Sequence, residues 1–362
     1  MKHCCLALTA AALLIGTGAA GLCAVDLEWR PAYQVVHTGD VLRIGLYAVS
    51  DSGSSHAISG LDAIMLYDQS SLDFRNLIAE GEPYDWLVDG FLWPSPDNLN
   101  DSLDDGSMYY TAWAQLGVPA YATPEGLLVT TLEFIGGAPL CRSVVSIPLS
   151  LGSAVTRVLD GTVPNNNVVG QCGTARVTVV EPGVLTSVGQ VKQQPDEAGC
   201  EVGGPIVTRS FASFFYLEDY SRAAGIRVNC DPSQVPAEGS TPRVSGVVRT
   251  INGERVIDQA TVTGCGEEAV PAPFGMNSTA PMMALNPQGL LVKLWGYASV
   301  PDPQASEFIL SDGSPYAMRV ELHGVTPPGD GDYVAVTGAL GADAGGPVLR
   351  VNNAGDMTLI AH

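Results

Sequence analysis

Aromatic and arginine side chains stand at alternating positions of strand-like segments in the C-terminal half of the chain. Tyr216 and Arg227 lie on two such segments, and Trp295 and Tyr297 stand two residues apart on a later one. Arg319 repeats the position of Arg227. Exposed aromatic faces beside hydrogen-bonding groups suit oligosaccharides, whereas aromatics in a basic groove suit single-stranded nucleic acid. We expect these five residues to point outward as ligand contacts. The alternative is that the aromatics cover a barrel side or a domain interface and that the arginines are solvated.

The histidines and carboxylates do not form a catalytic pattern. After the first 24 residues, the histidines are His37, His56, His323 and His362. None lies in an HExxH motif or beside a recognisable Ser or Cys nucleophile motif. Adjacent carboxylates such as Asp104 and Asp105 arise by chance among the turn residues of an acidic chain. We therefore expect a protein that is not an enzyme.

Side-chain oxygens are concentrated in the loop DNLNDSLDDG, from Asp97 to Gly106. Hard cations such as calcium prefer oxygen ligands, so calcium is the one cofactor to consider here. The spacing does not fit an EF-hand, and a solvated acidic loop is the alternative. No other cofactor is expected.

The charge balance disfavours partners that are themselves polyanions. The 362 residues include 17 Lys and Arg against 38 Asp and Glu, a formal net charge of -21. Such a chain repels phosphate backbones and anionic membranes. A cluster of arginines among aromatics keeps single-stranded nucleic acid open as a second alternative. These arginines are Arg209, Arg222, Arg227, Arg243, Arg249 and Arg255.

The first 24 residues have the layout of a secretory signal peptide. A Lys2-His3 start is followed by an apolar run from Leu6 to Ile15 and then by small residues, with cleavage expected near Ala24. The apolar run is shorter than the roughly 20 residues that span a bilayer, and no later segment is long enough. We expect an exported protein without a membrane span, located in the periplasm, at the cell surface or outside the cell.

The cysteines beyond the leader fit an oxidising compartment better than a metal site. Their wide spacing matches no zinc pattern, so disulfides are favoured. We expect Cys141 to pair with Cys172 and Cys200 with Cys265, which leaves Cys230 over. Sequence alone does not determine the connectivity, and free structural thiols are the alternative.

Short alternating strands predict an all-β chain. The residues Leu42, Ile44, Leu46 and Ala48 share one face of a strand by strict alternation. Further strands are predicted over residues 61–67, 127–134 and 175–180. The 41 Gly and 25 Pro supply turns and interrupt helices. Strands at this spacing indicate a sandwich in the N-terminal part.

Four blocks in the first half occur in an order that resembles a cohesin-type domain. They are Gly39-Asp40, GLDAIMLYDQSSLDF from Gly60, EGLLVTTLEF from Glu125, and TRVLDGTVPNNNVVG leading into ARVTVV. The resemblance covers residues 25–182 and implies a jelly-roll β-sandwich related to carbohydrate-binding modules. It also implies a protein partner, a calcium-loaded dockerin, bound through one face of the sandwich. No motif marks that face.

The second half contains an internal repeat. FFYLEDYSRAAGIRV, ending at Val228, is echoed by EFILSDGSPYAMRV, ending at Val320, 92 positions later. Five strands, a bent glycine-containing first strand and a GDxVxVxG entry resemble an OB-fold barrel. We expect one OB-like barrel over residues 197–265 and a second over 289–362. Residues 183–196 and 266–288 are expected to be linkers.

Together these observations predict a secreted, non-catalytic binding or scaffold protein. The cohesin-like module is expected to bind a dockerin-type protein or a polysaccharide, with the OB-like barrels as spacers or secondary ligand platforms. The first alternative is carbohydrate binding by the aromatic faces of the barrels.

Overall fold

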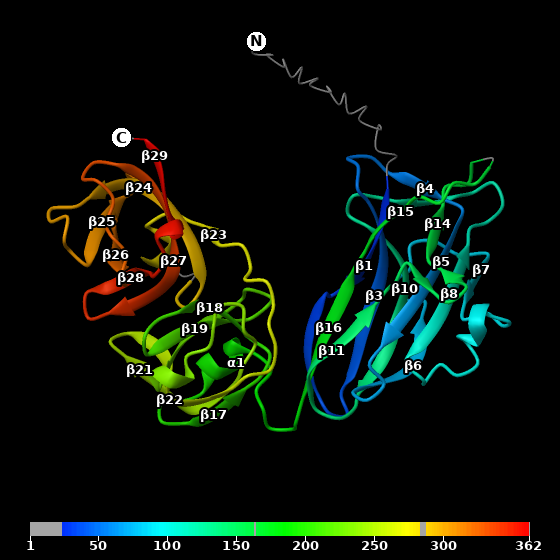
Figure 1. Ribbon diagram of the computed structural model, residues 1–362, viewed down its shortest axis with the longest axis horizontal. Coiled ribbons are helices and arrows are strands. Elements are labelled where there is room, and N and C mark those ends of the chain that lie inside the picture. The colour runs from blue at the N-terminus through cyan, green and yellow to red at the C-terminus, as the bar shows by residue number, and fades with distance from the viewer. Residues whose placement is uncertain (1–23, 163, 283–286, 362) are drawn as a thin grey trace, which may run out of the picture.

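The computed structural model describes residues 24–162, 164–282 and 287–361, which fold into three β-rich units in chain order (Figure 1). The signal peptide expected over residues 1–24 lies outside the described residues except for Ala24. In Figure 1 the first unit lies on one side, and the second and third pack against each other on the other. Within the described ranges α1 (Val188–Gln193) is the single α-helix, so the all-β expectation is confirmed.

The first unit is a sandwich of two sheets. One sheet has the strand order β15-β1-β3-β10-β6, and the facing sheet has the order β2-β16-β11-β5-β8-β7, with β14 paired to β5. The first sheet consists of β1 (Val25–Arg30), β3 (Val41–Ser50), β6 (Leu72–Ile78), β10 (Leu127–Gly136) and β15 (Val169–Cys172). The second consists of β2 (Tyr33–His37), β5 (Gly60–Tyr67), β7 (Val88–Gly90), β8 (Ser107–Trp113), β11 (Leu140–Ser146), β14 (Arg157–Leu159) and β16 (Thr174–Val180). Two small hairpins complete the unit: β4 (His56–Ile58) with β9 (Ala120–Ala122), and β12 (Ser150–Leu151) with β13 (Ala154–Val155).

Alternation decides which side of each strand enters the sandwich core, because successive side chains of a strand point to opposite faces. The buried side chains of β3 include Leu42, Ile44, Leu46 and Ala48, as predicted. The rings of Tyr67 from β5 and Phe134 from β10 meet across the core with centroids 5.2 Å apart. The strands predicted over 61–67, 127–134 and 175–180 are confirmed as parts of β5, β10 and β16, and with them the sandwich.

The second and third units are closed barrels. In the third, β24 pairs with both β25 and β27, so the order β24-β25-β26-β28-β27 returns to its start. In the second, residues 203–205 divide the corresponding first strand into β17 and β18, which lie at the two ends of the order β17-β21-β22-β20-β19-β18. The first barrel consists of β17 (Gly199–Val202), β18 (Ile206–Ser210), β19 (Phe214–Glu218), β20 (Gly225–Cys230), β21 (Arg243–Ile251) and β22 (Glu254–Thr263). The second barrel consists of β24 (Leu291–Ser299), β25 (Glu307–Ser311), β26 (Met318–Leu322), β27 (Tyr333–Asp343) and β28 (Gly346–Val351), flanked by β23 (Phe274–Gly275) and β29 (Met357–Ala361). The described residues also include four short 3-10 helices in loops: η1 (Pro96–Asn98), η2 (Pro232–Gln234), η3 (Ala280–Met282) and η4 (Ala354–Asp356).

The two barrels repeat one register, which confirms the duplication read from the sequence. The third and fifth strands run parallel in each, with Arg227 opposite Val256 in the first barrel and Arg319 opposite Val348 in the second. Both members of the second pair lie 92 residues after their counterparts. The structure therefore has the expected five-stranded OB-like barrels.

Residues 183–196, expected to be a linker, fold as part of the first barrel. Ser187 caps α1 by accepting a hydrogen bond from the backbone of Gln190. Val188 and Val191 of this helix are buried in the barrel core. The Asp219 carboxylate accepts a bond of 2.7 Å from the Val188 amide and so ties the helix to the loop after β19. A barrel without this helix would lose part of its core.

A disulfide joins the sandwich to the first barrel and corrects both expected pairings. The bond links Cys141 and Cys265, whose Cα atoms are 5.3 Å apart. Cys141 lies on β11, whereas Cys172 lies on β15 in the opposite sheet and packs against the sandwich core. Cys200 packs against the core of the first barrel, away from Cys265. Cys230 is free, as are Cys172 and Cys200.

Aromatic stacking and ion pairs surround this disulfide. The rings of Tyr33 and Tyr220 stack with centroids 4.3 Å apart, and the Tyr33 hydroxyl donates to the carbonyl of Gly204 at 2.5 Å. Burial raises the pKa of Tyr33 to about 12. Glu268, within the segment expected as the second linker, forms ion pairs with Arg142 and Arg176 of the sandwich. The joint between the two units therefore combines covalent, aromatic and electrostatic contacts.

We predict that the mature chain carries three titratable thiols. Five cysteines lie beyond residue 24, and the Cys141–Cys265 bond removes two of them. Thiol titration of residues 24–362 in denaturant without reductant should find three, and all five after reduction. Peptide mapping should recover the 141–265 cross-link. One free thiol, as the pairs Cys141–Cys172 and Cys200–Cys265 would leave, contradicts this assignment.

Candidate functional site

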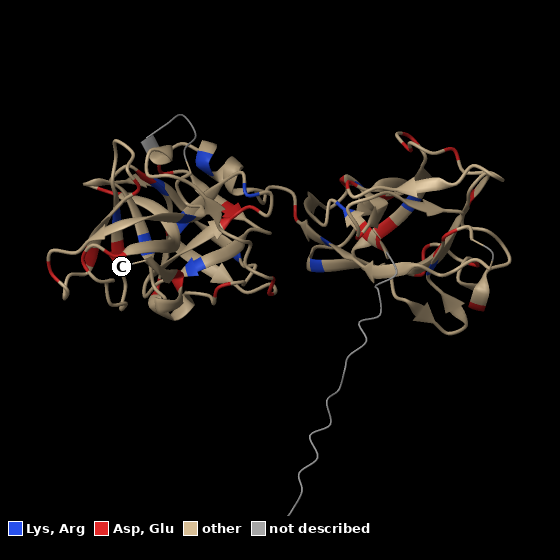
Figure 2. Cartoon of the chain, turned by 90° about the horizontal axis from the view of Figure 1, so that it is seen from above, with Lys and Arg blue, Asp and Glu red and all other residues tan. Residues whose placement is uncertain are grey.

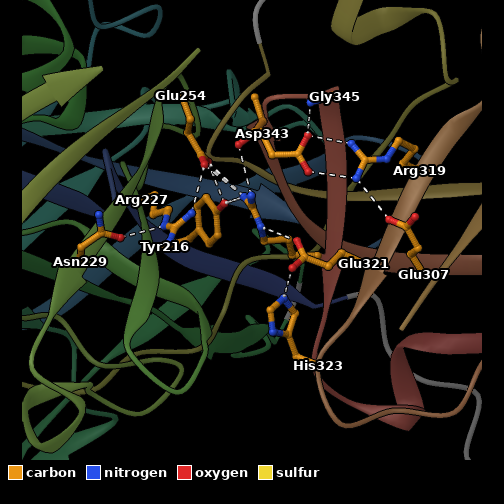
Figure 3. Close-up of polar contacts among 12 residues, drawn as sticks. Tyr216, Arg227, Asn229, Glu254, Glu307, Arg319, Glu321, His323, Asp343 and Gly345 are labelled. Atoms are coloured by element: carbon orange, nitrogen blue, oxygen red, sulfur yellow. Dashed lines mark hydrogen bonds and ion pairs between the residues drawn. The ribbon is translucent and has the colours of Figure 1, made fainter. Parts of the chain in front are cut away.

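Tyr216, expected to be a ligand contact, lies between the two barrels and has no exposed surface. It points out of the first barrel, as alternation predicts, but the second barrel covers it. Its hydroxyl donates to Glu254 Oε1 at 2.7 Å and accepts a hydrogen bond from Arg350 of the second barrel (Figure 3). The ligand-contact expectation for Tyr216 is therefore corrected, because this face is an interface.

Arg350 is the centre of the polar contacts between the barrels. Its guanidinium donates to Glu254 Oε2 at 3.1 Å in the first barrel and to Glu321 Oε2 at 2.9 Å in the second. A third bond, of 3.2 Å, reaches the carbonyl of Ala342. The Arg350 side chain is 5% exposed and that of Glu254 3%, so water screens this pair little.

Close approach of the two backbones depends on glycine and on an aromatic layer. A Cβ on Gly341 would lie 2.4 Å from the Tyr216 hydroxyl, so only glycine leaves room for the polar cluster. Phe211 stacks on Phe214 with centroids 4.5 Å apart, and the ring of His323 from the second barrel packs against Phe211 at 4.7 Å. These contacts exclude water from the interface and strengthen its hydrogen bonds.

Arg227 and Arg319 are both held by groups of the protein itself (Figure 3). Arg227 lies over the Phe214 ring at 3.9 Å and donates to the Asn229 side chain at 2.8 Å. Arg319 makes two bonds to the Asp343 carboxylate, of 2.7 and 2.9 Å, which raise its pKa. The structure does not bring these two arginines together with Trp295 and Tyr297, and their hydrogen bonds are already in use.

The arginines of the first barrel do not form a basic groove. Six arginines of this barrel each form an ion pair with at least one carboxylate within 3.6 Å: Arg209, Arg222, Arg227, Arg243, Arg249 and Arg255. Figure 2 shows acidic residues on the loops of both halves of the molecule. Single-strand binding requires an uncompensated positive channel with stacking aromatics, which this arrangement does not supply.

Trp295 and Tyr297 are exposed on the second barrel, as expected. They lie two residues apart on β24, and their exposed fractions are 42% and 61%. Tyr333, which was not among the residues predicted from the sequence, stands opposite Tyr297 on β27 with ring centroids 4.9 Å apart. The one sequence signal for Tyr333 is its position in the GDxVxVxG motif of the repeat, directly before an alternating strand.

A second exposed apolar area lies on the sandwich, and no sequence pattern had pointed to it. We call it the β7–β8 surface, defined by Leu87, Val88, Trp113, Leu116 and Val118. Val88 stands opposite Trp113 in the pairing of β7 with β8, and β7 is the edge strand of its sheet. Leu116 is 98% exposed. An apolar residue between Gln115 and Gly117 in a turn was the only local hint.

Close packing and hydrogen bonds fix the position of the side chains and loop that form the β7–β8 surface. Gly60 lies opposite Trp113, and a Cβ there would come within 2.9 Å of the indole, so glycine lets the ring lie against β5. The Tyr84 hydroxyl donates to the Val118 carbonyl at 2.5 Å and accepts from the Gln115 amide at 2.8 Å. A groove of about 410 Å³ beside Trp113 is lined by Ser59, Leu116, Val118, Asp160 and Asn165.

The remainder of the same outer sheet face is covered by the chain itself. Ile64 and Tyr109 are buried there under Leu99, beside η1, and Ala154 of the β12–β13 hairpin. The Asp62 carboxylate of β5 accepts a bond of 2.5 Å from Arg157. The β7–β8 surface is therefore the open part of a face that is otherwise closed.

Several side-chain oxygens of the acidic loop from Asp97 to Gly106 accept hydrogen bonds from the protein backbone. Asp97 accepts a hydrogen bond from the Ser153 amide, and Asp105 accepts one of 3.0 Å from the Ser107 amide. The Asn100 side chain bonds the backbone of Tyr109. Within the described ranges no group of three or more His, Cys, Asp or Glu side chains is arranged to hold a metal ion.

One carboxyl of the sandwich, that of Glu82, has a perturbed pKa. Burial, aided by the nearby Asp89 carboxylate, raises the pKa of Glu82 to about 7. The Oε1 atom of Glu82 is buried and finds no hydrogen-bond partner among the described residues. Such a carboxyl is more stable in its neutral form.

No protein-family model matches the sequence, and no curated protein matches it. Among solved structures, the sixth cohesin of scaffoldin B from Acetivibrio cellulolyticus, in complex with a Cel5 dockerin mutant, has a TM-score of 0.32 and 15% identity, covering 44% of this chain and 99% of that one. The seventh ScaB type I cohesin from Pseudobacteroides cellulosolvens has a TM-score of 0.32 and 11% identity, with 44% and 94% covered. A non-cellulosomal cohesin from Archaeoglobus fulgidus has a TM-score of 0.26 and 10% identity, with 43% and 91% covered. At these values the similarity says nothing about a shared ligand.

Among the described residues, none of the helices is both long enough and apolar enough to cross a membrane.

Replacing Arg350 should destabilise the barrel pair. Arg350→Met leaves the buried Glu254 with Arg227, at 3.6 Å, as its remaining cation, and we expect a loss of about 3 kcal/mol in the free energy of unfolding. Arg319→Met, which breaks a more exposed ion pair on the same barrel, should cost less than about 1 kcal/mol. Urea unfolding of residues 24–362, followed by tyrosine and tryptophan fluorescence, measures both. Equal losses for the two variants would show that the interface does not depend on Arg350.

Glu82 should make the sandwich less stable as the pH rises through 7. Its folded pKa lies above the value of the unfolded chain, so its contribution is fully present below about pH 4.5 and is lost above 7. Thermal unfolding of Glu82→Gln should match the parent at pH 4 and occur at a higher temperature at pH 8. The exposed neighbour Glu80→Gln is the control. A stability difference between Glu82→Gln and the parent that stays constant with pH would exclude this titration.

Proposed function

We propose that the chain is an exported, non-catalytic binding protein that captures a protein partner on the β7–β8 surface of its sandwich. The observation that carries this proposal is the exposure of Trp113 and Leu116 on a surface held rigid by Gly60 and Tyr84. Apolar side chains gathered in one exposed area mark interaction sites, and tryptophan is enriched among residues that dominate binding energy. The resemblance of the sequence to cohesins favours a dockerin-type partner.

Charge shapes the partner further. Asp160 lines the groove beside Trp113, the Asp85 carbonyl accepts a bond of 3.1 Å from the Gln115 side chain, and the chain carries a net charge of -21. An apolar centre with an acidic rim fits a partner that presents an apolar patch among basic residues. Rim charges act mainly on the association rate, so binding should be faster at low salt.

The barrels support this surface in the proposal. The face of the first barrel that OB-folds offer to ligands is occupied by the second barrel, which favours a spacer role for the pair. The disulfide and the Tyr33–Tyr220 stack make the joint to the sandwich firm. A disulfide at this joint also fits an oxidising compartment outside the cytoplasm.

The test is a calorimetric titration of residues 24–362 with each member of a panel of calcium-loaded dockerins. We expect binding by at least one member, and a loss of at least about tenfold for Leu116→Asp and for Trp113→Ala. Leu151→Asp, an exposed position on the β12–β13 hairpin, is the matched control and should bind as the parent does. Binding that survives both surface variants would place the contact elsewhere. Binding by none of the panel would remove the dockerin-type partner.

A further inference from the structure

The outer face of the second barrel carries a row of three aromatic side chains. Trp295 and Tyr297 stand on β24, and Tyr333 stands opposite Tyr297 on β27. The rings of Tyr297 and Tyr333 meet edge to face, with an interplanar angle of 62°. We call Trp295, Tyr297 and Tyr333 the aromatic row. It offers flat apolar faces to solvent, which is costly unless something covers them.

Two glycines allow close packing beside the aromatic row. The Trp295 indole lies against Gly275 of β23, where a Cβ would stand 3.2 Å from the ring. A Cβ on Gly296, between Trp295 and Tyr297, would lie 2.4 Å from the Ser311 carbonyl, so β25 packs tightly against β24 at this point. Trp295 projects beside a hollow. A larger residue at either glycine would displace the indole or part the strands.

The hollow combines an aromatic wall with a carboxylate. It measures about 370 Å³ and is lined by Gly275, Met276, Asn277, Trp295, Asp312 and Tyr333. Asp312 accepts a bond of 2.7 Å from the Ser278 amide on one oxygen and one of 2.9 Å from the Ser314 amide on the other. Burial raises the pKa of Asp312, but these bonds outweigh burial and hold the pKa below its usual value. The Ser278 and Ser314 side chains add to these bonds, so the carboxylate lines the hollow as an acceptor that is fixed in place.

We propose that this hollow and the aromatic row bind a neutral oligosaccharide. The faces of a sugar ring carry C–H groups that pack on aromatic planes, and its hydroxyls donate to a fixed carboxylate. Binding sites for small polar ligands join apolar walls with a few placed polar groups in this way. An ionised Asp312 repels phosphate and carboxylate, so polyanions such as nucleic acid or acidic glycans do not fit.

The site is separate from the surface that OB-folds use. That surface is the outer face of the second and third strands, where Arg319 of β26 is held by Asp343 and Glu307. The proposed site lies instead on the first and fourth strands, β24 and β27, together with β23. It is also on a different unit from the β7–β8 surface. A negative binding result at one of the two sites therefore does not contradict the proposal for the other.

Affinity electrophoresis of residues 24–362 in gels with soluble neutral polysaccharides tests the proposal. The probes are hydroxyethyl cellulose, xylan and galactomannan, with polygalacturonate as the acidic control. We expect retardation by at least one neutral polymer and none by polygalacturonate. Trp295→Ala should weaken the interaction at least about fivefold, because loss of one stacking aromatic removes about 1–3 kcal/mol in comparable stacks. Asp312→Asn, which retains one acceptor oxygen, should weaken it less.

Two control variants separate this site from others. Tyr316→Ala removes an exposed ring of the same barrel outside the row, and Trp113→Ala removes the sandwich indole; both should be retarded like the parent. Unfolding temperatures should show that Trp295→Ala and Asp312→Asn remain folded. Absence of retardation by every neutral polymer overturns the proposal, as does retardation by polygalacturonate alone or retardation that Trp295→Ala leaves unchanged. Dockerin binding lost in Trp295→Ala without any saccharide retention would make the row a protein contact instead.

Discussion

The buried contact of Arg350 with Glu254 and Tyr216 determines how the C-terminal half is built. Placing these charges out of water is costly, and the cost is offset only because their polar atoms are hydrogen-bonded. Arg350 bonds Tyr216 and Glu254 across the interface, and Glu321 and Ala342 within its own barrel. Once formed, the contact allows few other arrangements, since one missing partner leaves an unpaired buried charge. A second ion pair, from Arg209 to Asp356 at 2.6 Å, ties the same two barrels at another point. The barrels therefore act as one body.

This constraint also decides which surfaces remain for partners. A duplicated barrel begins with two equivalent faces, but here the face of the first barrel is consumed by the association. The second barrel keeps its first and fourth strands open, and the aromatic row lies there. On the sandwich, the chain covers part of an outer sheet face with η1 and the β12–β13 hairpin and leaves the β7–β8 surface open. The open surfaces thus lie at opposite ends of the chain.

Local patterns in the sequence predicted the parts of this structure that depend on neighbours along the chain. Alternation in residues 41–50 identified β3, and the 92-residue spacing identified the duplication. Alternation also indicated that the Tyr216 side chain points out of its barrel. It did not indicate that the second barrel covers this side chain, because the packing of two barrels depends on surfaces distant in sequence. The cysteine pairing failed for the same reason. Exposure of Leu116 likewise depends on what the rest of the fold leaves uncovered, which periodicity does not report.

The cross-link between Cys141 and Cys265 has a mechanical consequence. It closes a loop with a sequence separation of 124 residues, and all the strands of the first barrel lie inside that loop. If tension acts between a partner held on the sandwich and a ligand held on the second barrel, the covalent path runs from residue 141 through the sulfur atoms to residue 265. The first barrel then carries none of the load along its backbone. A chain that links two anchored objects would keep its extension under pull, with its central barrel folded and shielded.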